Sequence, residues 1–142
     1  MVTNPVTGEL YISNTEANNL IRFEGFGTNS TTVRGNIVQN RITLIDGGDV
    51  KPRDLNKQLD HTQVRASDAQ RRLAMAQPLG MAQPLGMAVS ADGNTLYAAG
   101  FGSEKVAVYN TGELSDDSFA VSEASQILLS GGGPTGLALD ES

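Results

Sequence analysis

The apolar residues of this chain fall in short runs separated by turn-forming residues, a pattern typical of β-strands. Residues 96–99 and 106–109 are the clearest runs. The Asp-Gly-Asn stretch at 92–94 comes just before them and tolerates the positive φ angles of a tight turn. With an apolar run at 84–89 and another at 126–129, this stretch predicts four consecutive strands.

The same pattern occurs again at the start of the chain. Tyr11 matches Tyr97 at an offset of 86 residues, and without a gap this places residues 20–23 on 106–109. Close to the other end, residues 134–139 match residues 84–89 at an offset of 50. Self-similarity at a spacing of tens of residues is typical of repeat architectures.

Four antiparallel strands in about 50 residues correspond to one blade of a β-propeller. The sequence therefore predicts an all-β fold with about two four-stranded antiparallel propeller blades, the first strand of a third, and a partly helical insertion. A closed propeller needs at least about four blades, so we expect an internal fragment of a larger protein. The alternative is a divergent small β-domain that only looks repetitive. The expected divisions are blade 1 over 1–46, with its strands near 2–5, 10–14, 20–23 and 41–45, the insertion over 47–83, blade 2 over 84–130, and the first strand of blade 3 over 131–142.

The expected insertion differs in composition from the blades. Ser67 is a good N-cap, and Asp68 opens a run of helix-forming residues that reaches Met75. The hexapeptide at 75–80 is repeated at 81–86, which we interpret as a local duplication that lengthens the loop. Residues 25–40 and 110–125 are expected to be long connections between the last two strands of each blade.

The repeat resembles the YVTN family of β-propeller repeats. Residues 11–14 (Tyr-Ile-Ser-Asn) stand where the family has Tyr-Val-Thr-Asn, and residues 90–93 (Ser-Ala-Asp-Gly) are similar to its Ser-Pro-Asp-Gly turn. Residues 97–100 keep only the tyrosine of that signature. The resemblance implies a periplasmic or cell-surface location, and its relatives include surface proteins, lactonase-like propellers and propellers joined to haem domains. It implies no particular chemistry.

Composition excludes several classes of function. The net charge of −6 argues against a nucleic-acid partner, because phosphate binding needs clustered basic residues. There is no cysteine, which excludes disulfides, thiolate metal sites and covalent haem attachment within this sequence. No apolar run approaches the roughly 18 residues of a membrane span. From residue 73 onward, Lys105 is the one basic residue against eight acids.

Basic residues gather in the insertion, where six of them lie against three acids between residues 51 and 72. This is either an ordinary solvated face or a contact patch for an acidic partner. The insertion should lie at the same end of the blades as the turns at 14–19 and 100–105, which adds two further candidates. The candidate contact surface comprises Lys51, Arg53, Lys57, His61, Arg65, Arg71, Arg72, Asn14 and Phe101.

No catalytic or metal-binding set stands out. His61 is the only histidine and has no partners at ligand spacing, so an exposed loop residue is expected. The acids at 46, 49, 54 and 60 lack the order of a calcium loop. The glycines at 131–133 lack the lysine and helix of a phosphate loop. We therefore expect no cofactor and no metal.

The function predicted is a non-enzymatic scaffold segment that makes protein or ligand contacts in a larger extracytoplasmic protein, with the remaining blades of its propeller as partners. The alternative is part of a lactonase-like or cofactor-associated enzyme whose catalytic residues lie largely outside this sequence. A surface-layer repeat is a third possibility.

Overall fold

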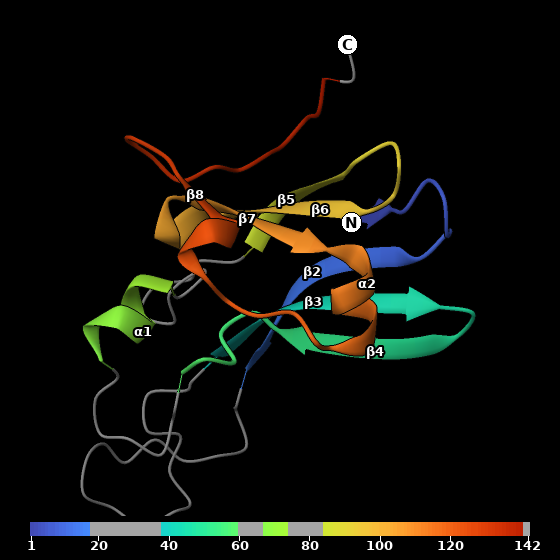
Figure 1. Ribbon diagram of the computed structural model, residues 1–142, viewed down its shortest axis with the longest axis horizontal. Helices are drawn as coiled ribbons and strands as arrows, with labels where there is room; N and C mark the ends of the chain where they lie inside the picture. Colours follow the sequence, from blue (N-terminus) through green and yellow to red (C-terminus); the bar gives the residue numbers. More distant parts are fainter. Residues whose placement is uncertain (18–37, 60–66, 74–83, 141–142) are drawn as a thin grey trace, which may run out of the picture.

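The chain folds into two four-stranded antiparallel sheets that lie one over the other (Figure 1). The computed structural model describes residues 1–17, 38–59, 67–73 and 84–140. In each sheet the strands follow one another in chain order. This confirms the predicted all-β fold. Sheet 1 contains β1 (Val2–Thr3), β2 (Leu10–Ala17), β3 (Val38–Asp46) and β4 (Asp49–Asp54), and sheet 2 contains β5 (Pro84–Val89), β6 (Thr95–Gly100), β7 (Lys105–Asn110) and β8 (Gln126–Leu128).

The offset of 86 residues holds for the first two strands of each sheet. Val2 pairs with Tyr11 in sheet 1, and Ala88 pairs with Tyr97 in sheet 2, so the two registers coincide. The turn between the strands is closed in the same way in both sheets. In sheet 1 the Asn4 amide donates across the turn to the Glu9 carbonyl (2.8 Å), and in sheet 2 the Ser90 amide donates to the Thr95 carbonyl (2.9 Å).

The third and fourth strands of sheet 1 differ from the prediction. The segment at 41–45, expected to be the fourth strand, lies within β3 and pairs directly with β2. The fourth strand is β4, in residues assigned to the insertion. Gly47 and Gly48, both with positive φ, form the two-residue hairpin that joins these strands, and Pro52 is tolerated because β4 is an edge strand. Residues 20–23, the expected third strand, lie outside the described residues.

Four short helical elements accompany the strands in the described residues. The predicted helix in the insertion is present as α1 (Asp68–Leu73). The connection from β7 to β8, expected to be a loop, contains α2 (Thr111–Asp116) and a 3₁₀ turn (Glu123–Ser125). A further 3₁₀ turn (Phe101–Ser103) joins β6 to β7. The sequence predicted a strand at 134–139, but residues 134–140 form no ladder of hydrogen bonds with either sheet and are not a strand.

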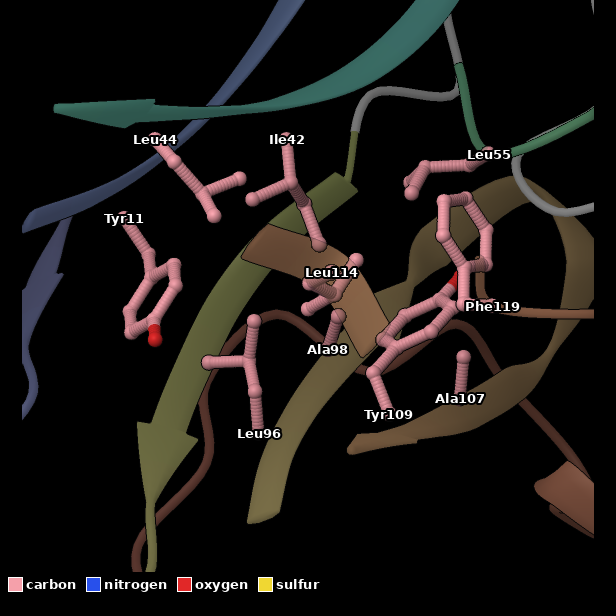
Figure 2. Packing of buried hydrophobic residues seen from close by; sticks show 10 residues of the cluster. All are labelled: Tyr11, Ile42, Leu44, Leu55, Leu96, Ala98, Ala107, Tyr109, Leu114 and Phe119. Carbon is pink, nitrogen blue, oxygen red and sulfur yellow. The ribbon is translucent and has the colours of Figure 1, made fainter. Parts of the chain in front are cut away.

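The core lies between the two sheets (Figure 2). Successive side chains of a strand point to opposite faces of the sheet, so only one face of each sheet contributes to this core. The face of sheet 1 that packs against sheet 2, here called its front face, carries Tyr11, Ile42 and Leu44, all fully buried. Leu114 of α2 packs into the same cluster. Sheet 2 contributes its back face to this core through Leu96, Ala98, Ala107 and Tyr109.

Candidate functional site

An open hollow of about 950 Å³ lies at one end of sheet 2. The 3₁₀ turn at 101–103, the first residue of β7, the end of α1 and the edge of β8 surround it. The insertion helix therefore does lie beside the turn between the second and third strands, as the sequence predicted. The hollow is lined by Arg72, Phe101, Gly102, Ser103, Glu104, Lys105, Glu123, Gln126, Leu128 and Gly133.

Lys105 is the buried charge of this hollow, with only 7% of its surface exposed. Its ammonium donates to the main-chain carbonyl of Arg72 and to the side-chain oxygen of Gln126 at 3.0 Å. The Arg72 carbonyl belongs to the last turn of α1, where carbonyl groups have no partner inside the helix. Lys105 therefore holds the end of α1 against sheet 2.

The electrostatics around Lys105 are mixed. Burial lowers the pKa of its ammonium from the usual value, while the Glu123 carboxylate acts in the opposite direction. Glu104 and Arg72 also line the hollow, which therefore holds two cations and two carboxylates. Glu104 adopts a left-handed backbone conformation (φ 51°), and this turns the chain from the 3₁₀ turn into β7.

Two exposed apolar side chains flank the charges. Phe101 is 46% exposed and Leu128 is 75% exposed. Both line the hollow, which therefore combines apolar surface with a buried ammonium. Such a combination suits a small molecule or peptide side chain with an apolar body and a polar group.

Arg53 on β4 and Lys57 in the turn after it, both predicted contact residues, bind the end of α2 and do not line the hollow. Arg53 Nε donates to the Leu114 carbonyl at 2.5 Å, and its Nη2 donates to the Ser115 carbonyl at 2.6 Å. Lys57 donates to the Asp117 carbonyl at 2.9 Å. These carbonyls lie at the C-terminal end of α2, where cations are favourable. Sheet 1 thus holds the helix of sheet 2 through these two side chains.

The predicted contact residues whose side chains the structure describes lie in three separate places. Arg72 and Phe101 meet at the hollow, and Lys51, Arg53 and Lys57 lie around the end of α2. Asn14 lies on β2, where its side chain accepts a hydrogen bond from Thr43. Arg71 lies in α1, and His61 and Arg65 lie outside the described residues. A role in contacts stays a prediction for all nine.

Sequence reasoning did not select Lys105, Glu123 or Leu128. A signal was present, because Lys105 is the one basic residue after position 73. A lone base at the start of an apolar strand is hard to interpret without knowing what covers it. The helix end that it binds comes from a segment 33 residues earlier in the chain.

At the opposite end of the sheets, a second hollow of about 360 Å³ lies beside a buried polar network. Tyr11 donates to the Glu9 carboxylate at 2.7 Å, and Asn4 donates to the Gly93 carbonyl at 2.8 Å. The Thr111 hydroxyl donates to the same carbonyl at 2.8 Å. These groups satisfy one another across the sheets, so the network is part of the interface between them.

Within the part of the chain that the structure describes, no group of three or more histidine, cysteine, aspartate or glutamate side chains is arranged to hold a metal ion. None of the described helices is long and apolar enough to cross a bilayer.

The comparisons with known proteins bear on the fold alone. No family model matches the sequence, and no curated protein matches it. Among solved structures, the chain is similar to hydrazine synthase of Kuenenia stuttgartiensis, with a TM-score of 0.54 and 18% identity. The match covers 95% of this chain and 37% of that one, so this chain spans little more than a third of its structural relative. Because that relative contains a β-propeller, the likeness supports a propeller-like fold.

Proposed function

We propose that this chain is a non-enzymatic scaffold segment of a propeller-like protein, and that it binds a ligand or partner through the hollow beside Lys105. The observation that carries this proposal is the combination found there. A buried ammonium lies next to Phe101 and Leu128, two large apolar side chains that remain exposed to solvent.

The position of the hollow supports a binding role. Its walls come from two connections and the insertion helix, whereas the strands beneath them are held by ladder hydrogen bonds. Binding residues are commonly carried by loops that a rigid scaffold positions. The tie between Lys105 and the end of α1 fixes one wall before any ligand arrives, which lowers the ordering cost of binding.

The charges define the ligand chemistry. An anionic group would be attracted by Lys105 and Arg72, and a cationic group by Glu104 and Glu123. The apolar body of the ligand would cover Phe101 and Leu128, which gains about 25 cal/mol for each Å² of apolar surface removed from water. A compound with an aromatic body and a single acidic group satisfies the two cations and the apolar wall together.

The fluorescent probe 8-anilinonaphthalene-1-sulfonate has this chemistry and tests the proposal. Titration into the 142-residue chain should give a saturable, one-to-one increase in fluorescence. Phe101→Ser and Leu128→Ser should each weaken binding about tenfold. The matched control is Val50→Ser, because Val50 is 64% exposed on the hairpin of sheet 1 and should leave binding unchanged.

Two results would overturn the proposal. One is the absence of saturable binding to the unmodified chain. The other is binding that survives Phe101→Ser but is lost with Ile127→Ser, because the probe would then lie on the open face of sheet 2 instead of in the hollow.

A further inference from the structure

The charged side chains around the hollow balance one another in number. Lys105 and Arg72 are its cations, and Glu104 and Glu123 are its carboxylates. Among the described residues, neither carboxylate has a salt-bridge partner. The hollow therefore offers both signs of charge to a ligand.

The Lys105 ammonium has one hydrogen-bond donor left over. An ammonium group carries three N–H donors. Two of them are used, by the Arg72 carbonyl and the Gln126 side-chain oxygen, and the third has no acceptor among the described residues. Because only 7% of Lys105 is exposed, an acceptor brought by a ligand would satisfy a donor that water hardly reaches. The exposed Arg72 guanidinium lines the same hollow and suits a carboxylate, which can accept two of its N–H bonds.

The two carboxylates are carried by turns whose main chain is fixed. The Glu104 amide donates to the Phe101 carbonyl at 3.4 Å, and the Glu104 carbonyl accepts from the Leu129 amide at 3.0 Å. Glu123 opens the second 3₁₀ turn, which a capping box closes. Both glutamate side chains are exposed. A cationic group of a ligand therefore meets two negative groups on preformed turns.

The size of the hollow favours a ligand larger than one amino acid. Its volume of about 950 Å³ is near the upper end of the range of about 300–1,000 Å³ found for sites that enclose drug-sized ligands. Its two exposed apolar side chains come from different walls, Phe101 from the first 3₁₀ turn and Leu128 from β8. A ligand with two apolar side chains can cover both.

We propose that the hollow binds a short apolar peptide with both ends free, the size of a dipeptide, an inference that rests on the proposed binding function. The terminal carboxylate accepts hydrogen bonds from Lys105 and Arg72. The terminal ammonium lies by Glu104 and Glu123, and the two side chains of the peptide cover the apolar walls. A purely anionic ligand leaves both carboxylates without a counter-charge and is repelled by them, whereas a zwitterion pairs every charge of the hollow.

The dipeptide leucyl-tryptophan tests the proposal. The chain contains no tryptophan, so the fluorescence anisotropy of the peptide reports binding directly. Titration with the 142-residue chain should give saturable, one-to-one binding. The N-acetylated peptide, which has no ammonium, should bind about fivefold more weakly. The peptide amide, which has no carboxylate for Lys105, should bind about tenfold more weakly. Free tryptophan covers only one apolar wall and should also bind about tenfold more weakly.

Two variants separate the two ends of the peptide. Glu104→Gln combined with Glu123→Gln should abolish the preference for the free peptide over its acetylated form, since the ammonium loses both counter-charges. Arg72→Gln should weaken binding of the free peptide more than binding of its amide. The matched control is Glu113→Gln, because Glu113 is an exposed carboxylate of α2 that does not line the hollow. It should keep both preferences.

The outcomes distinguish this inference from the proposed function. If the chain binds 8-anilinonaphthalene-1-sulfonate saturably but binds the acetylated peptide as tightly as the free one, this inference is wrong and the proposed function stands. A preference that survives in the double glutamine variant would also overturn it. Free tryptophan that binds as tightly as the dipeptide would overturn the assignment to a peptide. If neither the sulfonate probe nor the peptide binds, both proposals fail.

Discussion

Arg53 and Leu114 link the two sheets through a charge-assisted hydrogen bond, from the guanidinium on β4 to a main-chain carbonyl in the last turn of α2. The Arg53 side chain is only 13% exposed, and its second bond to the Ser115 carbonyl makes the contact bidentate. Arg53, which was predicted to be a surface contact residue, thus holds α2, which lies in a segment predicted to be a loop.

Arg53→Met should lower the free energy of unfolding by about 2 kcal/mol, because hydrogen bonds to charged groups contribute about 1.5–3 kcal/mol and the carbonyls of α2 lose their partner. Urea denaturation monitored by circular dichroism measures this. Lys51→Met is the control, because the Lys51 ammonium lies 3.7 Å from the Asp46 carboxylate and 3.5 Å from the Ser115 hydroxyl. It should cost about 0.5 kcal/mol or less. Equal losses in the two variants would contradict the role given to Arg53.

Gly86→Ala should displace residues 133–140 from sheet 2. The added Cβ would lie 2.6 Å from Gly136 Cα and 2.9 Å from the Leu137 amide nitrogen, and both are main-chain atoms that cannot rotate away. We expect a loss of about 1–3 kcal/mol and faster hydrogen exchange at Leu137. Gly136→Ala tests the same contact from the other side, where a Cβ would meet open space, and should leave stability within about 0.5 kcal/mol. If the two variants behave alike, the close approach is not decisive.

Asn110→Ala should cost about 1 kcal/mol, because the Asn110 side chain caps α2 by accepting a hydrogen bond from the Glu113 amide at 3.1 Å. Asn110→Ser should retain most of that stability, since serine is also a good N-cap. Thermal unfolding of the three chains compares them. An Asn110→Ser chain as unstable as the alanine variant would show that the cap contributes through something other than its hydrogen-bonding oxygen.

Stability should fall as the pH rises above about 10. Burial raises the pKa of Tyr11 to about 12, and the hydrogen bond to Glu9 acts in the same direction. The unfolded chain ionises near pH 10, where the folded chain still keeps the proton. The stabilisation is therefore complete below pH 10 and is lost as the pH rises towards 12.

Tyr11→Phe isolates this effect, because burial also raises the pKa of Tyr109, which is present in both chains. Urea midpoints at pH 8, 10 and 11 should fall more steeply for the unmodified chain than for Tyr11→Phe. Parallel curves would show that Tyr11 keeps an ordinary pKa in the folded protein.

Sheet 2 was predictable strand by strand because its local signals agree. The Asp-Gly-Asn turn at 92–94 joins β5 to β6, and the apolar runs at 96–99 and 106–109 lie in β6 and β7. Sheet 1 was assigned less well, because residues 20–23 look like a strand and match 106–109 without a gap. The two glycines at 47–48 were assigned to the start of the insertion, although they form a hairpin to β4. A strand with a proline and four charged residues gives almost no local signal.

The hollow was predictable only in its location. Arg72 was selected as one of the basic residues of the insertion, and Phe101 because the turn at 100–105 was expected at the same end of the blades. Lys105 and Leu128 were not selected as site residues, because the place of each in the hollow depends on what surrounds it, a helix end in one case and an exposed sheet edge in the other.

The sequence by itself determined the repeat, the strand character and the turns, because these depend on residues close together in the chain. The tertiary structure decided which strands pair, which cations hold which helix end and which apolar face stays open. Those outcomes depend on contacts between residues tens of positions apart, such as Arg53 with Leu114 and Lys105 with Arg72. Their free energy exists only once the two sheets have come together, so no local pattern records it.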